Sequence, residues 1–131
     1  MIVPDTTVWI DFSKNIVAPH TDILKREMAG RNIVTTDVIM VEFLQGFRHE
    51  HDYIAAEKMM HSLVYRAFWG KRHVRQIAHH YRILRRKGIT IRSTIDVIIG
   101  TFCLENDFSL LHNDPADFDA MEKYLGLKIV R

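Results

Sequence analysis

The segment "MIVPDTTVWIDFS" (residues 1–13) joins a short apolar run to a helical pattern through an acidic residue. The run "MIVP" (1–4) predicts a short buried strand that ends at Asp5, and "TTVWIDFS" (6–13) predicts a helix. A strand, an acid at its end and a helix behind it make the start of a β-α unit. The same order recurs along the chain, and this recurrence decides the fold.

Four further apolar or β-branched runs predict strands, and helical patterns fill the intervals between them. The strands are expected at residues 32–36, 62–68, 108–112 and 127–130, and the helices at 20–29, 37–47, 52–62, 71–88, 93–106 and 115–125. This alternation favours an α/β fold with a mostly parallel central β-sheet flanked by α-helices on both faces, an α/β/α sandwich.

The length and composition are those of one soluble globular domain, expected to span residues 1–131, with 47% hydrophobic and 26% charged residues. The single cysteine, Cys103, lies in an apolar run and suits a buried thiol in a reducing compartment. The longest uncharged apolar stretch, "VIIGTFCL" (97–104), is much shorter than the roughly 20 residues of a membrane span. With no leader pattern at the start, we expect a cytoplasmic protein without membrane association.

The charge is distributed unevenly, although the net charge is only +2. The segment from Lys58 to Arg92 contains ten Lys and Arg residues and no Asp or Glu. Within it, residues 71–88 predict an amphipathic helix, whose expected core stripe is Val74, Ile77, Ala78, Tyr81 and Leu84. A neighbouring stripe is basic and consists of Arg72, Arg75, His79, Arg82 and Arg86. This stripe is either a solvated helix face or a surface that contacts phosphates.

Four acidic residues are placed to meet at one edge of the predicted sheet, because ligands in open α/β sheets bind outside the carboxyl ends of the strands. Asp5 follows the first strand and Asp114 follows the fourth, while Asp96 begins a helix. Glu42 lies in a helix that is apolar on most sides, where a carboxylate needs a partner or a metal. Converging carboxylates repel one another unless a divalent cation screens them, so this cluster predicts a metal.

Each acid also has a purely structural interpretation. Asp5 is placed to cap the helix that follows it. Ser93 and Asp96 have the spacing of a capping box. Asp114 precedes a proline, as a good N-cap does, and Asp117 three residues later completes a similar pattern. A capping role and a metal-binding role are compatible at Asp96, since its carboxylate has a second oxygen.

Four motifs in this order and spacing resemble those of PIN-domain ribonucleases, and most closely those of VapC toxins from bacterial toxin–antitoxin pairs. The motifs are "DTTVWID" (5–11), "VEFLQG" (41–46), "IRSTIDVIIGTFCLEN" (91–106) and "LLHNDPADFDAMEKYLGLKIV" (110–130). The sequence departs from the family pattern at Pro4, at Gly100 and at His112, where the family often has Thr.

The resemblance implies an endoribonuclease that depends on Mg²⁺ or Mn²⁺ and leaves 5′-phosphate and 3′-hydroxyl ends. By resemblance, Asp5 and Asp96 are the direct metal ligands, and Glu42 is a water-mediated ligand or orients the nucleophile. Asp114 is a further ligand, direct or through water, and Asp117 is the alternative fourth acid.

The resemblance also implies supporting residues and partners. The hydroxyls of Thr6 and Ser93 would hold the carboxylates in place. The partners would be an RNA substrate, such as a transfer or ribosomal RNA, a VapB-like antitoxin and a second copy of the chain.

Other functions are weighed against this one. A haloacid-dehalogenase-type phosphatase needs a second Asp two residues after the first, and Thr7 occupies that position. A non-catalytic RNA-binding module would keep the basic stripe but would not need the acids. A zinc site from "HEHD" (49–52) or from His79 and His80 lacks the HExxH spacing, and adjacent helical histidines point in different directions.

Overall fold

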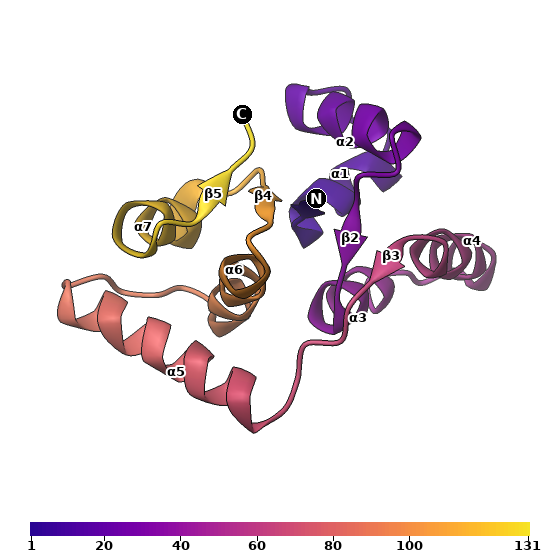
Figure 1. Ribbon diagram of the computed structural model, residues 1–131. Coiled ribbons are helices and arrows are strands. Elements are labelled where there is room, and N and C mark those ends of the chain that lie inside the picture. Colours follow the sequence, from indigo (N-terminus) through magenta and orange to yellow (C-terminus); the bar gives the residue numbers. More distant parts are fainter.

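The computed structural model describes residues 1–131 and contains five strands and seven helices in the predicted alternation (Figure 1). The elements are β1 (Ile2–Pro4), α1 (Thr6–Ser13), α2 (Pro19–Ala29), β2 (Val34–Thr35), α3 (Asp37–Leu44), α4 (Glu50–His61), β3 (Val64–Tyr65), α5 (Lys71–Arg86), α6 (Thr94–Asn106), β4 (Ser109–Leu111), α7 (Pro115–Leu125) and β5 (Lys128–Ile129). None of the helices has the length and apolar character needed to cross a lipid bilayer.

All of the strand pairs are parallel. Strand β4 lies between β1 and β5, and Pro4 is paired with Leu111. Strands β2 and β3 form a second pair, and a parallel bridge between Ile2 and Ile33 aligns this pair with β1. The strands therefore follow the spatial order β3-β2-β1-β4-β5.

The chain leaves β1 toward one end of this row and leaves β4 toward the other end. The space between the carboxyl ends of β1 and β4 is therefore the switch point at which ligands bind in such sheets. Helices α1 and α2 lie on one side of the strands, and α5 and α6 lie on the other (Figure 1). The predicted α/β/α arrangement with a parallel sheet is confirmed.

The core is one cluster of 24 buried hydrophobic residues, in which Trp9, Phe102 and Phe118 are the largest side chains. Helix α6 runs through this core, which explains its long apolar run. A Cβ atom at Gly100 would lie 2.2 Å from Cε of Met121, so the glycine permits the close approach of α7. Cys103 is buried as predicted, and burial raises the pKa of its thiol.

The predicted core stripe of α5 is partly wrong. Ile77 and Leu84 are buried, but Val74 is 49% exposed and Ala78 is exposed as well. The helix is rotated so that two histidines face α6, where His73 is 2.9 Å from an oxygen of Glu105 and His80 is 2.8 Å from the hydroxyl of Thr101. These polar pairs lie on the face of α5 that packs against α6, where hydrophobic periodicity predicts apolar side chains.

Candidate active site

Asp5 is buried at the carboxyl end of β1, with 3% of its surface exposed. It is also the N-cap of α1, and its Oδ2 accepts hydrogen bonds from the Thr7 amide (3.4 Å) and the Thr7 hydroxyl (2.8 Å). Burial raises the pKa of Asp5 in spite of these bonds. Asp5 therefore does cap α1, and burial still disfavours the charged form of its carboxyl group. The supporting hydroxyl of Thr7 was not predicted from the sequence.

Asp96 lies half-buried in the first turn of α6. Burial, together with the negative charges of Asp5, Asp117 and Asp114, raises its pKa to about 7. The predicted capping box is wrong, because the Ser93 side chain makes no capping bond and the Asp96 amide donates to the backbone carbonyl of Ser93 (3.2 Å). Asp96 is thus not engaged in capping its helix, and its carboxyl group is under the influence of three acidic neighbours.

Asp117 is 2% exposed and anchors the start of α6. Its carboxylate accepts hydrogen bonds from the backbone amides of Arg92 (2.9 and 3.2 Å) and Ser93 (2.9 Å). It therefore does not complete a capping box with Asp114, which caps α7 by accepting from the Ala116 amide (3.2 Å). The charges of Asp114 and Asp117 both raise the pKa of Asp96, so both alternative fourth acids lie within electrostatic reach of it.

Glu42 is half-buried on α3 and is fixed by α1. Its Oε1 accepts a hydrogen bond from the Thr6 hydroxyl (2.7 Å). Burial raises the pKa of Glu42, the Thr6 bond lowers it, and the charge of Asp5 raises it further. Thr6 thus holds a carboxylate as expected, whereas the Ser93 hydroxyl does not.

The four predicted acids come from different parts of the chain, and some of them influence one another electrostatically. Asp5 raises the pKa of Glu42 and of Asp96, and Asp114 also raises that of Asp96. No group of three or more His, Cys, Asp or Glu side chains is spaced to hold a metal ion as the side chains stand. The donor set nevertheless fits a hard divalent cation, because burial raises the pKa of the Asp5, Glu42 and Asp96 carboxyl groups and the charge of Asp5 adds to the shift at Glu42 and Asp96. A bound cation would relieve both effects.

His112 stands directly after β4, beside these acids. Its ring packs against that of Phe118, with 5.1 Å between the ring centroids. Its Nδ1 is buried and has no hydrogen-bond partner. Burial lowers the pKa of His112, and the charge of Asp5 opposes this shift. The sequence alone gives no signal for a role of His112 beyond its departure from the family pattern.

A second polar cluster fixes the loop that carries Asp114. Oδ2 of Asp11 on α1 is 2.7 Å from Nε2 of His20 on α2 and accepts a hydrogen bond from the side chain of Asn113 (2.8 Å). These contacts tie α1, α2 and the loop after β4 together. The sequence gives no signal for this cluster, because its members are up to 102 positions apart.

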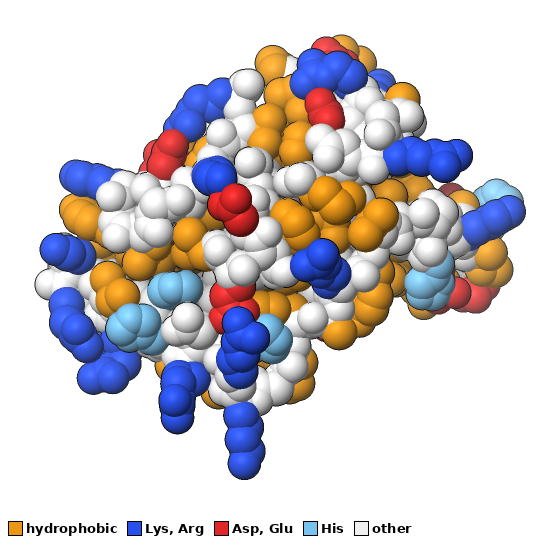
Figure 2. Space-filling model, viewed as in Figure 1, with side chains coloured by type: hydrophobic (Ala, Val, Ile, Leu, Met, Phe, Trp, Pro, Cys, Tyr) orange, Lys and Arg blue, Asp and Glu red, His pale blue; other side chains and the backbone are white.

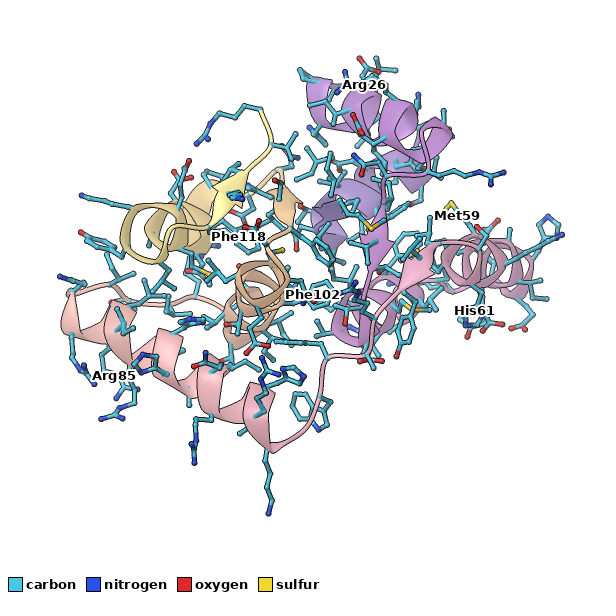
Figure 3. All side chains as sticks on the ribbon, in the orientation of Figure 1. Arg26, Met59, His61, Arg85, Phe102 and Phe118 are labelled. Atoms are coloured by element: carbon cyan, nitrogen blue, oxygen red, sulfur yellow. The ribbon has the colours of Figure 1, made fainter.

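The basic stripe predicted on α5 is exposed along its whole length. Figure 2 shows Lys and Arg side chains projecting over this helix at the lower left, and Figure 3 shows Arg85 pointing outward while Phe102 and Phe118 point inward. Beside the stripe, Trp69, Val74 and Tyr81 line an apolar groove of about 430 Å³. Trp69 is 70% exposed. This surface therefore combines cationic groups with accessible aromatic rings.

The chain is similar to proteins of known family. A family model described as PIN domain matches residues 2–124. The VapC ribonuclease Mb1587 of Mycobacterium bovis and the ribonuclease VapC11 of Mycobacterium tuberculosis are each 28% identical over 131 residues, covering 98% of this chain and 96% of the relative. The crystal structure of DNA-bound VapBC from Salmonella typhimurium matches with a TM-score of 0.79 and 18% identity, covering 98% of this chain and 96% of that chain. At that identity the structural match shows the fold alone.

Proposed function

Since this chain belongs to the PIN domain family, we propose that it is an endoribonuclease that depends on Mg²⁺ or Mn²⁺ and acts as the toxin of a VapBC-type pair. The observation that carries the proposal is Asp96, whose pKa is raised to about 7 by burial and by Asp5, Asp117 and Asp114. A carboxyl pKa raised by burial and by several neighbouring charges is typical of functional centres. The 28% identity to two VapC ribonucleases supports the choice of RNA as the substrate.

Asp5 and Asp96 are the proposed direct ligands of the cation, and Asp114 is a further ligand, direct or through water. When bound, a divalent cation lowers the pKa of water and neutralises charge that develops on the cleaved phosphodiester. Glu42 is held by Thr6 at 2.7 Å and orients the attacking water. The proposed hydrolysis would leave 5′-phosphate and 3′-hydroxyl ends, as the resemblance to PIN-domain ribonucleases implies.

Asp117 acts through the backbone and not on the substrate. Its bonds to the amides of Arg92 and Ser93 fix where α6 begins, and therefore where Asp96 stands. Positioning of this kind contributes to catalysis because reacting groups must be held within a fraction of an ångström. We assign Asp117 a positioning role and retain Asp114 as the fourth acid.

The exposed basic stripe of α5 is the proposed surface that grips RNA. Guanidinium groups contact phosphates well, and accessible aromatic rings such as Trp69 can stack on unpaired bases. This combination suits single-stranded regions or loops of a structured RNA, and a transfer RNA or a ribosomal RNA would supply them.

The proposed protein partners are a VapB-like antitoxin and a second copy of the chain. The structural relative from Salmonella typhimurium is a VapBC complex, which supports the antitoxin. A cleft of about 690 Å³ beside Glu42, lined by Ile10, Phe43, Phe47 and Met59 among others, offers an apolar surface for a partner segment. A segment seated there would lie against a proposed catalytic carboxylate, so binding and inhibition would coincide.

The decisive test is cleavage of bulk RNA by the purified protein. We expect cleavage with Mg²⁺ or Mn²⁺ and none with EDTA, and products that are degraded by an exonuclease specific for 5′-phosphate ends. Asp5→Asn and Asp96→Asn should abolish cleavage and leave the circular dichroism spectrum unchanged, while Asp22→Asn, an exposed acid on α2, should cleave normally. RNA that is bound but left intact with every divalent cation would identify a binding module, and hydrolysis of a small phosphate ester instead would identify a phosphatase.

A further inference from the structure

His112 and Asp5 leave neighbouring strands at the same level. Pro4 and Leu111 are paired in register, and the Asp5 amide donates to the Leu111 carbonyl (2.8 Å). Parallel neighbours lie about 4.8 Å apart, and residues opposite one another project to the same face of a sheet. His112, directly after Leu111, is therefore brought beside Asp5 by the sheet itself, at the switch point between β1 and β4.

The buried Nδ1 of His112 lacks the partner that a buried polar atom needs. Leaving such an atom unpaired costs about 1–3 kcal/mol. Three other buried side-chain polar atoms also lack partners, on Trp9, Thr35 and Glu105. Of these atoms, only the imidazole nitrogen can offer a nitrogen lone pair, since the indole N–H of Trp9 is a donor alone. Asp5, Asp114 and Asp119 bring negative charge close to His112, and Arg131 brings positive charge. A cation bound between the imidazole nitrogen and an acid would satisfy both.

We propose that His112 supplies an imidazole nitrogen to the divalent-cation site of Asp5 and Asp96, so that this site takes Mn²⁺ in preference to Mg²⁺. The inference rests on the proposed function, because it concerns the same cation. An all-oxygen set suits Mg²⁺ and Mn²⁺ alike, whereas Mg²⁺ keeps oxygen ligands and waters and imidazole favours transition metals. The Thr that PIN-domain ribonucleases often have at this position would leave such a site with oxygen ligands only.

The test measures binding and not activity. Isothermal titration with MnCl₂ and with MgCl₂ should give a dissociation constant for Mn²⁺ lower by roughly tenfold or more. Pulsed electron paramagnetic resonance of the Mn²⁺-loaded protein should show coupling to a directly bound ¹⁴N nucleus. In His112→Thr this coupling should vanish and Mn²⁺ affinity should fall roughly tenfold, with Mg²⁺ affinity changed less than about twofold. His61→Thr, at an exposed histidine of α4, is the matched control and should change neither property.

The outcomes separate this inference from the function on which it rests. The role of His112 would be overturned if Mn²⁺ bound without nitrogen coupling and if the ratio of the Mn²⁺ and Mg²⁺ dissociation constants were the same for the unsubstituted and His112→Thr proteins. Metal-dependent RNA cleavage would be unaffected by that result. If no divalent cation binds at all, both the ligand assignment and the metal-dependent nuclease are wrong. The resonance measurement on the unsubstituted protein needs no variant, so a His112→Thr protein that failed to fold would not prevent the test.

Discussion

Replacing Asp96 by Asn should stabilise the protein in the absence of divalent cations. The pKa of Asp96 is raised from 3.8 to about 7, chiefly by burial and the charge of Asp5. At about 1.4 kcal/mol per pKa unit, this shift corresponds to at most about 4 kcal/mol. Asp96 is only half-buried, and solvent screening reduces the expected gain to about 1–2 kcal/mol. The Asn side chain keeps the size of Asp96 and can donate to the carboxylate of Asp117.

The gain should depend on pH with a definite sign. A carboxyl group with a raised pKa in the folded state does not destabilise the fold below its unfolded pKa of about 4, where it is protonated in both states. The penalty develops as the pH rises toward 7 and is complete above that value, so the advantage of Asp96→Asn should be near zero at pH 4 and largest at pH 8.

Thermal unfolding with EDTA measures this prediction directly. At pH 8, a gain of about 1–2 kcal/mol corresponds to a rise in Tm of roughly 3–10 °C for a domain of this size. Adding MgCl₂ should stabilise the unsubstituted protein and leave Asp96→Asn unchanged, because a ligand stabilises only a protein that binds it. Asp22→Asn is the control and should show no such gain. Equal Tm values at pH 8, or a gain that is the same at pH 4, would refute the electrostatic reasoning.

The remaining predictions concern positioning and RNA contact. Asp117→Asn should lower the free energy of unfolding in urea by about 2–3 kcal/mol, because it loses charge-assisted bonds to two backbone amides, while Asp114→Asn should change it by less than about 0.5 kcal/mol, since Asn is an equally good N-cap. Thr6→Val should lower kcat in RNA cleavage roughly tenfold, because it removes the hydroxyl that donates to Glu42. Thr6→Ser keeps this hydroxyl and should retain the kcat of the unsubstituted protein. Arg75→Ala and Arg82→Ala should each weaken RNA binding and reduce the slope of log affinity against log salt by about 0.7; unchanged slopes would remove α5 from the RNA surface.

The fold is predictable because its signal is local. Each strand is a short apolar run, each helix has its own periodicity, and the alternation of the two leaves few topologies. The placement of Asp5 and Asp114 after two neighbouring strands also follows, since parallel strands bring their carboxyl ends to one edge. These inferences need only the position of a residue relative to its own element.

Contacts between elements account for what the sequence does not predict. The spacing of Ser93 and Asp96 fits a capping box. In the structure, however, the backbone amides before α6 donate to the carboxylate of Asp117, which lies on helix α7. The rotation of α5 follows from His73 and Glu105, which are 32 positions apart. A local sequence pattern indicates which hydrogen bonds and contacts a segment can form within itself. It does not indicate the partners that other segments supply after packing.

The central strand of the sheet is also the first one synthesised. Its partner β4 begins at Ser109, and the register joins Ile2 to that residue. During translation, Asp5 is made at the start, whereas its neighbouring strand β4 and Asp114 follow only after more than four-fifths of the 131 residues. Such distant pairing slows folding and leaves no partial product in which the acidic edge is assembled. The proposed catalytic edge of the sheet is therefore complete only after Asp114 has been synthesised.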